Sequence, residues 1–223
     1  MTAPRCHVLI EHLGSEPAAA RRGEIRAFAT CRNERLRLPA FLQHYRDLGV
    51  ARFFIVDNES SDGTAEYLEA QPDVHLFRTT NRYSEAGMGI DWVNALLARF
   101  GTGSWCVTVD IDELLVYPGS EHAALPGFTK YLDENGVEAL ACMLLDMYPE
   151  TPLKDSAYSA GDLLAAAPYF DAGPYRRVPV SKCPGVLIRG GMRERVFYPE
   201  FRARGFGAKL FDAMLHRVAF RTP

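Results

Sequence analysis

Two aspartates separated by one residue are the feature of this sequence most suggestive of chemistry. Asp110 and Asp112 stand in the string DIDE, directly after an apolar run. Alternate side chains of an extended chain point the same way, so both carboxylates would share one side and Ile111 would turn away. Carboxylates that close repel each other unless a cation lies beside them. Oxygen ligands suit Mg²⁺ or Mn²⁺, so we predict a divalent cation here, although an exposed acidic loop has the same pattern.

Three further polar residues follow other apolar runs and could contact a ligand. Asp57 could accept hydrogen bonds from a ribose hydroxyl or a base N–H. It could equally be a turn residue, because the Asp-Asn-Glu-Ser-Ser-Asp-Gly string that begins with it is rich in turn-forming residues. Arg32 and Glu34 could face a nucleotide, or form an exposed pair at the start of a helix, where the helix dipole favours the glutamate.

The elements that would position these residues alternate between strands and helices. Apolar, β-branched runs predict strands at 24–33, 52–58, 74–79, 104–110 and 137–145. Between them, apolar residues recur at helical spacing; the first such face is Leu38, Phe41, Leu42, Tyr45 and Leu48, ended by Gly49. This alternation predicts an α/β fold with a mostly parallel central sheet flanked by helices. Ligands bind such sheets at the carboxyl ends of the strands, where the polar residues fall.

Composition narrows the class of protein. The chain has 223 residues, of which 48% are hydrophobic and 24% charged, enough for one well-buried domain. A net charge of −3 argues against a nucleic-acid partner. No apolar run reaches the ~18 residues of a membrane span. The five cysteines show no metal-ligand spacing, which fits a reducing cytoplasm. We expect a cytoplasmic location, with peripheral contact to an inner membrane as a variant.

Three strings occur in this order along the sequence: ATCRNE, HYRDLGVARFFIVDNESSDGT and WCVTVDIDELL. Together they resemble the nucleotide-sugar glycosyltransferases of inverting family 2, in particular its bacterial branch with RNE and DxDE motifs. The resemblance covers roughly residues 24–148 and implies the Rossmann-like fold called GT-A. It implies donor binding by Thr30, Arg32, Glu34, Asp57 and Asp110, and a Mn²⁺ or Mg²⁺ ion at Asp110 and Asp112.

The resemblance also implies a reaction. A carboxylate would take the proton of an acceptor hydroxyl, which attacks the sugar with inversion and releases a nucleoside diphosphate, expected to be UDP. Asp146 is the first candidate for this base, because it follows the fifth predicted strand; capping the turn at Tyr148 and Pro149 is an equal alternative. Glu194 and Asp171 are weaker candidates. The acceptor could be a glycan, a lipid-linked molecule or another hydroxyl compound.

The remainder of the chain, 149–223, is expected to form the acceptor side of the same single domain, and its abrupt end at Pro223 is compatible with a cut from a longer chain. Basic residues there, Arg189, Arg193 and Arg195, could hold a diphosphate or an anionic acceptor. A solvated basic face is the commoner outcome and the one we favour.

Other functions stay open. A phosphatase of the haloacid dehalogenase type also uses a DxD motif, but normally on its first strand. A module that binds a nucleotide sugar without turnover fits if no base is present. A dinucleotide-dependent oxidoreductase fits less well, because Gly87-Met88-Gly89 lacks the third glycine of the fingerprint.

Overall fold

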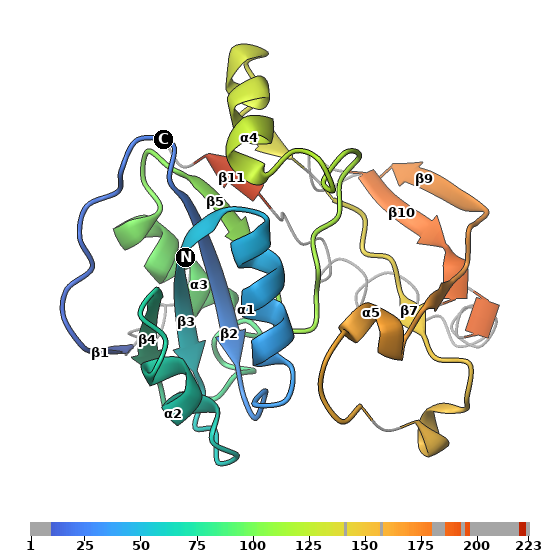
Figure 1. Ribbon diagram of the computed structural model, residues 1–223, viewed down its shortest axis with the longest axis horizontal. Coiled ribbons are helices and arrows are strands. Elements are labelled where there is room, and N and C mark those ends of the chain that lie inside the picture. The colour runs from blue at the N-terminus through green and yellow to red at the C-terminus, as the bar shows by residue number, and fades with distance from the viewer. Residues whose placement is uncertain are drawn as a thin grey trace, which may run out of the picture. The chain divides into compact units, whose positions relative to one another are not determined.

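The computed structural model describes residues 10–140, 142–156, 158–179, 186–192, 195–196 and 219–221. The chain forms two compact units (Figure 1). The first consists of Met1–Ala141 together with Arg217–Pro223, and the second of Cys142–His216. The second unit is thus an insertion between two segments of the first. The sequence predicts one domain with an internal division at 148/149, which is seven residues beyond the boundary between the two units.

A seven-stranded sheet forms the centre of the first unit, in the order β1-β4-β3-β2-β5-β11-β6. Its parallel core comprises β2 (Ile25–Cys31), β3 (Val50–Asp57), β4 (Val74–Arg78) and β5 (Trp105–Thr108). β6 (Ala139–Leu140) runs the same way, because β11 (Ala219–Arg221) is antiparallel to both β5 and β6. β1 (Glu11–Leu13) pairs antiparallel with β4 at the far edge. The predicted α/β fold with a mostly parallel sheet is confirmed.

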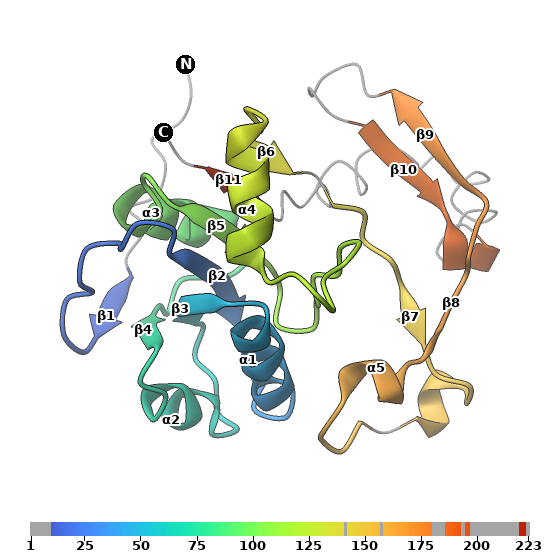
Figure 2. The same cartoon turned by 45° about the horizontal axis from the view of Figure 1, so that its top comes forward.

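Helices cover both faces of this sheet, which explains why its central strands are mostly apolar on both sides. On one face Phe28, Phe54 and Phe77 pack with α3 (Ile90–Phe100) around the fully buried Trp92. On the opposite face Phe53 meets Phe41 of α1 (Leu38–Asp47), with ring centroids 6.2 Å apart. Figures 1 and 2 show α1 and α3 on either side of β2 and β3. Successive side chains of a strand point to opposite faces of the sheet, and here each face is apolar because helices cover it.

The first predicted helix forms close to its expected limits. The face of α1 that carries Leu38, Phe41, Leu42 and Tyr45 is buried, and the chain turns after it at Gly49 with a φ of +89°. A left-handed glycine is the usual residue just beyond a helix end. The other helices described in this unit are the short α2 (Thr64–Glu69) and α4 (Leu125–Glu134), which is as long as α1.

The largest differences from the predicted strands concern β6, β5, β1 and β11. The strand expected at 137–145 is only β6, since Met143 and Leu144 are 42% and 41% exposed and lack the burial that apolar strand residues seek. β5 ends at Thr108, two residues before Asp110. The short strands β1 and β11 were not predicted, because three residues are too few to show a period.

The second unit contains small elements. β7 (Met147–Tyr148) pairs with β8 (Tyr169–Phe170), and β9 (Tyr175–Pro179) pairs with β10 (Val186–Gly190). A 3-10 turn (Leu153–Asp155) and the one-turn helix α5 (Leu163–Ala166) lie between β7 and β8. Among the described residues of the chain, no helix has both the length and the apolar character needed to cross a membrane.

Candidate functional site

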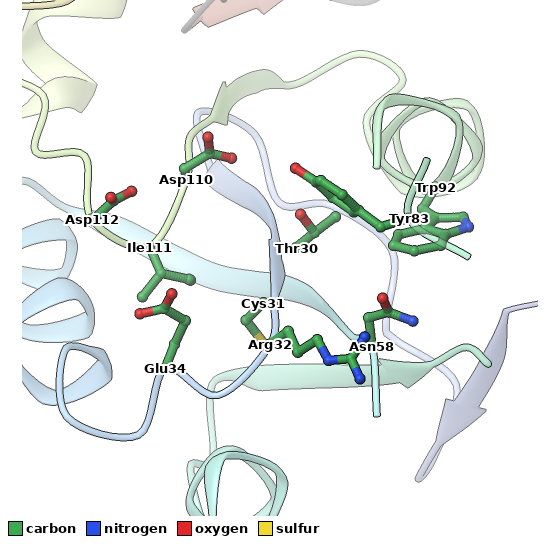
Figure 3. A pocket seen from close by; sticks show the side chains of 10 residues that line it. All are labelled: Thr30, Cys31, Arg32, Glu34, Asn58, Tyr83, Trp92, Asp110, Ile111 and Asp112. Atoms are coloured by element: carbon green, nitrogen blue, oxygen red, sulfur yellow. The ribbon is translucent and has the colours of Figure 1, made fainter. Parts of the chain in front are cut away.

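The order of the strands creates a crevice at the carboxyl ends of β2 and β5. The chain runs outward from β2 through β3 to β4 and then returns to the other side of β2 as β5 (Figure 2). Loops leaving β2 and β5 therefore diverge, and open α/β sheets bind ligands at such a switch point. A cavity of about 360 Å³ lies there, a size within the usual range for ligand sites. Its lining residues are Thr30, Cys31, Arg32, Glu34, Asn58, Tyr83, Trp92, Asp110, Ile111 and Asp112 (Figure 3).

The two aspartates of the DIDE string both line this cavity, but not as residues of an extended strand. The Glu113 N–H donates to the carbonyl oxygen of Asp110 at 3.0 Å, which closes a turn, and the Glu113 carboxylate accepts from the Asp110 N–H at 3.2 Å. Ile111 is 2% exposed. Figure 3 shows both aspartate carboxylates directed to the same side and Ile111 turned away. The predicted juxtaposition is present, whereas the predicted cause, strand alternation, is wrong.

The donor set around the aspartates fits a cation shared with a ligand better than a closed metal site. Within the described residues, no group of three or more His, Cys, Asp or Glu side chains could hold a metal ion. Mg²⁺ is commonly held by one or two carboxylates together with substrate phosphates. Asp110 and Asp112, two carboxylates that line an open cavity, match a cation held jointly by the protein and by substrate phosphates.

Asn33 joins the segment that follows β2 to the loop after β3. Its N–H donates to the Ser60 hydroxyl at 2.8 Å, and its side-chain oxygen accepts from the Ser61 N–H at 2.8 Å. Asn33 has a φ of +58°, a conformation that asparagine tolerates better than most residues. The middle residue of the RNE string therefore fixes the backbone. Its neighbours Arg32 and Glu34 line the cavity.

Glu34 is held from two directions. Its N–H donates to the Thr64 hydroxyl at 2.9 Å, and its carboxylate forms an ion pair with Arg37 at 2.8 Å. Thr30, the third predicted residue of this segment, also lines the cavity. The structure thus brings together five of the predicted residues of the first unit: Thr30, Arg32, Glu34, Asp110 and Asp112.

Asp57 is placed differently and does not line the cavity. It is 1% exposed, and its carboxylate accepts from the Ser60 N–H at 3.2 Å with the Cys31 thiol 3.8 Å away. Burial and the nearby Asp57 raise the pKa of the Cys31 thiol well above its usual value. The turn interpretation of Asp57 matches these contacts. The contact of Asp57 with the base of a donor nucleotide stays a prediction. The next residue, Asn58, lines the cavity.

Two aromatic residues of the lining were not predicted. Tyr83 follows β4, and Trp92 belongs to the first turns of α3; their ring centroids are 5.9 Å apart. Burial raises the pKa of the Tyr83 hydroxyl, and the charges of Asp110 and Asp112 raise it further. The Trp92 indole N–H is buried and finds no acceptor among the described residues. The helical spacing of Trp92 indicated only a core position, and no motif surrounds Tyr83.

The candidate bases belong to the second unit. Asp146 directly precedes β7, is partly exposed, and contributes, after burial and Asp171, to raising the pKa of the Tyr175 hydroxyl. Asp171 forms an ion pair with Arg195 at 2.9 Å and accepts from the Tyr148 hydroxyl at 2.7 Å. These two contacts lower the pKa of Asp171, which makes it a weaker proton acceptor. Asp146 stays a prediction, and Glu194 and Arg193 lie outside the described residues.

Comparisons with known proteins leave the family open. No protein-family model and no curated protein matches the chain. Among solved structures, 4-diphosphocytidyl-2C-methyl-D-erythritol synthase is similar over 85% of this chain and 83% of its own, with 13% identity and a TM-score of 0.38. A similarity this low assigns no activity to the chain.

Proposed function

We propose that this protein binds a nucleoside-diphosphate sugar at the β2–β5 crevice and transfers the sugar to a hydroxyl acceptor. The observation that carries the proposal is the position of Asp110 and Asp112 in a cavity at the switch point of the sheet. Carboxylates in that position suit a divalent cation, Mn²⁺ or Mg²⁺, bound together with a diphosphate. The family 2 glycosyltransferases that the sequence strings resemble use the same combination.

The charge of the lining explains why such a ligand would need the cation. The lining contains one guanidinium, that of Arg32, and three carboxylates, those of Glu34, Asp110 and Asp112. Arg37 pairs with Glu34, and the two aspartates remain as the acidic side of the cavity. A diphosphate would be repelled by this lining on its own. A bound divalent cation would reverse the local charge and stabilise the negative charge of the leaving diphosphate.

The residues of the chain have distinct tasks in this proposal. Asp110 and Asp112 hold the cation, and Arg32 and the Thr30 hydroxyl supply hydrogen-bond donors to the ligand. A carboxylate, for which Asp146 is the first candidate, takes the proton from the acceptor hydroxyl. The acceptor oxygen then bonds to the anomeric carbon from the face opposite the leaving group. The bond from that carbon to the diphosphate breaks, so configuration inverts.

Binding is tested by thermal shift with UDP, GDP, CDP and ADP, each with and without Mn²⁺. At about 100 times Kd, one ligand stabilises the protein by about 2.7 kcal/mol, which raises Tm by roughly 5–10 °C in a chain of this size. We expect one nucleotide to do so only with Mn²⁺ present. Asp112→Asn should abolish the shift, whereas the exposed Asp47→Asn on α1 should keep it. A shift that is independent of Mn²⁺ and of Asp112 would contradict the proposal.

Transfer, as distinct from binding, is tested by release of the nucleoside diphosphate from its sugar conjugate. If Asp146 is the base, Asp146→Asn should lower turnover by about 10²–10⁴ while donor binding is unchanged. Asp155→Asn, another acidic position of the second unit, serves as the matched control. Donor binding by the wild-type protein with no turnover towards any acceptor would identify a binding module instead.

A further inference from the structure

Tyr83 lies in the cavity, yet the sequence motifs assign it nothing. Figure 3 shows its ring extending across the cavity from the side of Trp92, with the hydroxyl directed towards Asp110. The residue is 39% exposed. A large aromatic side chain whose polar end reaches the acidic side of a ligand-sized cavity is placed to contact what binds there.

The loop that carries Tyr83 is fastened at several points. The Asn58 side-chain amide donates to the carbonyl oxygens of Thr79 and Asn81, each at 3.1 Å. The carbonyl oxygen of Tyr83 itself accepts from the Met88 N–H at 3.0 Å. These bonds hold the backbone that carries Tyr83 before any ligand binds, which reduces the entropy that the loop loses on binding.

The ring of Tyr83 is also confined by its neighbours. It packs against Trp92, and one ring edge lies over Gly89, where a Cβ atom would come within 2.8 Å of the Tyr83 Cε2 atom. The same Cβ would lie 3.1 Å from the Thr30 hydroxyl oxygen. Because the body of the ring is occupied by these contacts, the hydroxyl end is the part of Tyr83 left for a ligand.

We propose that the Tyr83 hydroxyl donates a hydrogen bond to a phosphate oxygen of the diphosphate held at Asp110 and Asp112. This inference rests on the proposed function and adds a ligand-contacting residue to it. The lining has little positive charge to meet a phosphate, since three of its charged side chains are carboxylates and Arg32 is its one cation. A phenol adds a donor on that side without adding negative charge.

The test compares Tyr83→Phe with the wild-type protein and uses inorganic pyrophosphate, which makes the result independent of the nucleobase. Mn²⁺ binding alone is measured by electron paramagnetic resonance, and pyrophosphate binding in saturating Mn²⁺ by calorimetry. We expect the variant to bind Mn²⁺ as the wild type does and pyrophosphate on the order of ten- to a hundred-fold more weakly, the effect of one hydrogen bond to a charged group. Tyr131→Phe, at a 59% exposed position of α4, is the matched control and should change neither value.

Three results would overturn the inference. Equal pyrophosphate affinity in Tyr83→Phe and wild type rules out the hydrogen bond. An equal loss of affinity for Mn²⁺ alone places the effect at the cation and not at the phosphate. If the wild-type protein binds neither pyrophosphate nor any nucleoside diphosphate with Mn²⁺, the proposed function fails and this inference fails with it.

Discussion

Glu24 is a carboxylate shared by two arginines at the amino end of β2, the end of the strand away from the cavity. Its Oε1 atom accepts from Arg26 Nε at 2.7 Å and from Arg52 Nε at 2.6 Å. The side chains of Arg26 and Glu24 are only 4% and 6% exposed. Arg26 also donates to the carbonyl oxygen of Phe100, so the cluster connects β2, β3 and the end of α3. Removing one member would leave buried charge without compensation.

Glu24→Gln should therefore destabilise the first unit by roughly 3 kcal/mol at neutral pH. The chain offers a matched control in Glu16, whose ion pair with Arg99 at 2.9 Å has side chains 63% and 55% exposed. Glu16→Gln should cost less than about 1 kcal/mol. Urea unfolding followed by tryptophan fluorescence measures both, because Trp92 and Trp105, the two tryptophans of the chain, lie in the first unit. Equal effects of the two substitutions would contradict the role given to burial.

The same residue predicts a dependence on pH. Burial opposes ionisation of Glu24, but hydrogen bonds from Arg26, the Arg21 N–H and Arg52 outweigh it and lower the pKa below the ordinary 4.5. A lowered folded-state pKa adds stability that is fully present above the unfolded-state pKa and is lost as pH falls through the folded-state value. The stability difference between wild type and Glu24→Gln should persist from about pH 7 to 5 and narrow by about pH 3. Urea midpoints at these three pH values check the sign.

At the scale of elements, two glycines occupy equivalent positions before helices with different surroundings. Gly63 precedes α2 with a φ of +87°, and Gly89 precedes α3 with a φ of +82°. A Cβ atom at Gly63 would meet nothing within 4 Å, whereas one at Gly89 would collide with Tyr83. An alanine would therefore suffer similar backbone strain at both positions, but only at Gly89 would its Cβ atom also collide with Tyr83.

Alanine at either position should cost about 1–2 kcal/mol of stability from the left-handed backbone. Gly89→Ala should in addition weaken binding of the Mn²⁺–nucleotide complex, because Tyr83 and Thr30 must move. Gly63→Ala should leave that affinity unchanged. Calorimetric titration of both variants, beside their urea midpoints, separates the two effects; equal affinities would argue that Tyr83 can shift without consequence.

The elements predicted well are those whose burial follows one clear period. The helix face from Leu38 to Tyr45 and the apolar strands β2 and β3 could be predicted because each packs against a full layer. The edge strands were predicted less well: β1 was not predicted, and β6 is far shorter than the strand predicted at 137–145. Both are short and pair on one side only. In the site, Asp110 and Asp112 were found by spacing, although a turn and not a strand aligns them. Tyr83 could not be predicted as a site residue, because only the fold brings the loop that carries it to the end of β2.

At the scale of the whole molecule, the last described residues complete the central sheet. β11 pairs with β5 through Ala219↔Val107 to Arg221↔Trp105 and with β6 through Ala219↔Leu140 and Phe220↔Ala139. Within the part of the chain that the structure describes, β11 is therefore the strand that joins β6 to the rest of the sheet. Without β11, the edge of β5 is open and β6 has no strand to pair with.

A chain ending at residue 216 should be less stable in its first unit, on the order of 2–4 kcal/mol if each lost backbone hydrogen bond contributes about 1 kcal/mol. A chain ending at residue 221 keeps β11 and is the control. Trp105, opposite Arg221, should report the change through its fluorescence in urea unfolding. An unchanged midpoint in the shorter chain would show that β11 contributes nothing to the sheet.

The insertion of the second unit has a consequence for biosynthesis. A ribosome that has finished β6 must still translate Cys142–His216 before β11 exists, which takes roughly 4–15 s at 5–20 residues per second. Throughout that interval β5 presents unpaired backbone groups to other nascent chains, the situation in which edge-to-edge aggregation begins. Slower translation of the inserted segment should thus lower the soluble yield, and a chaperone that shields β5 should restore it.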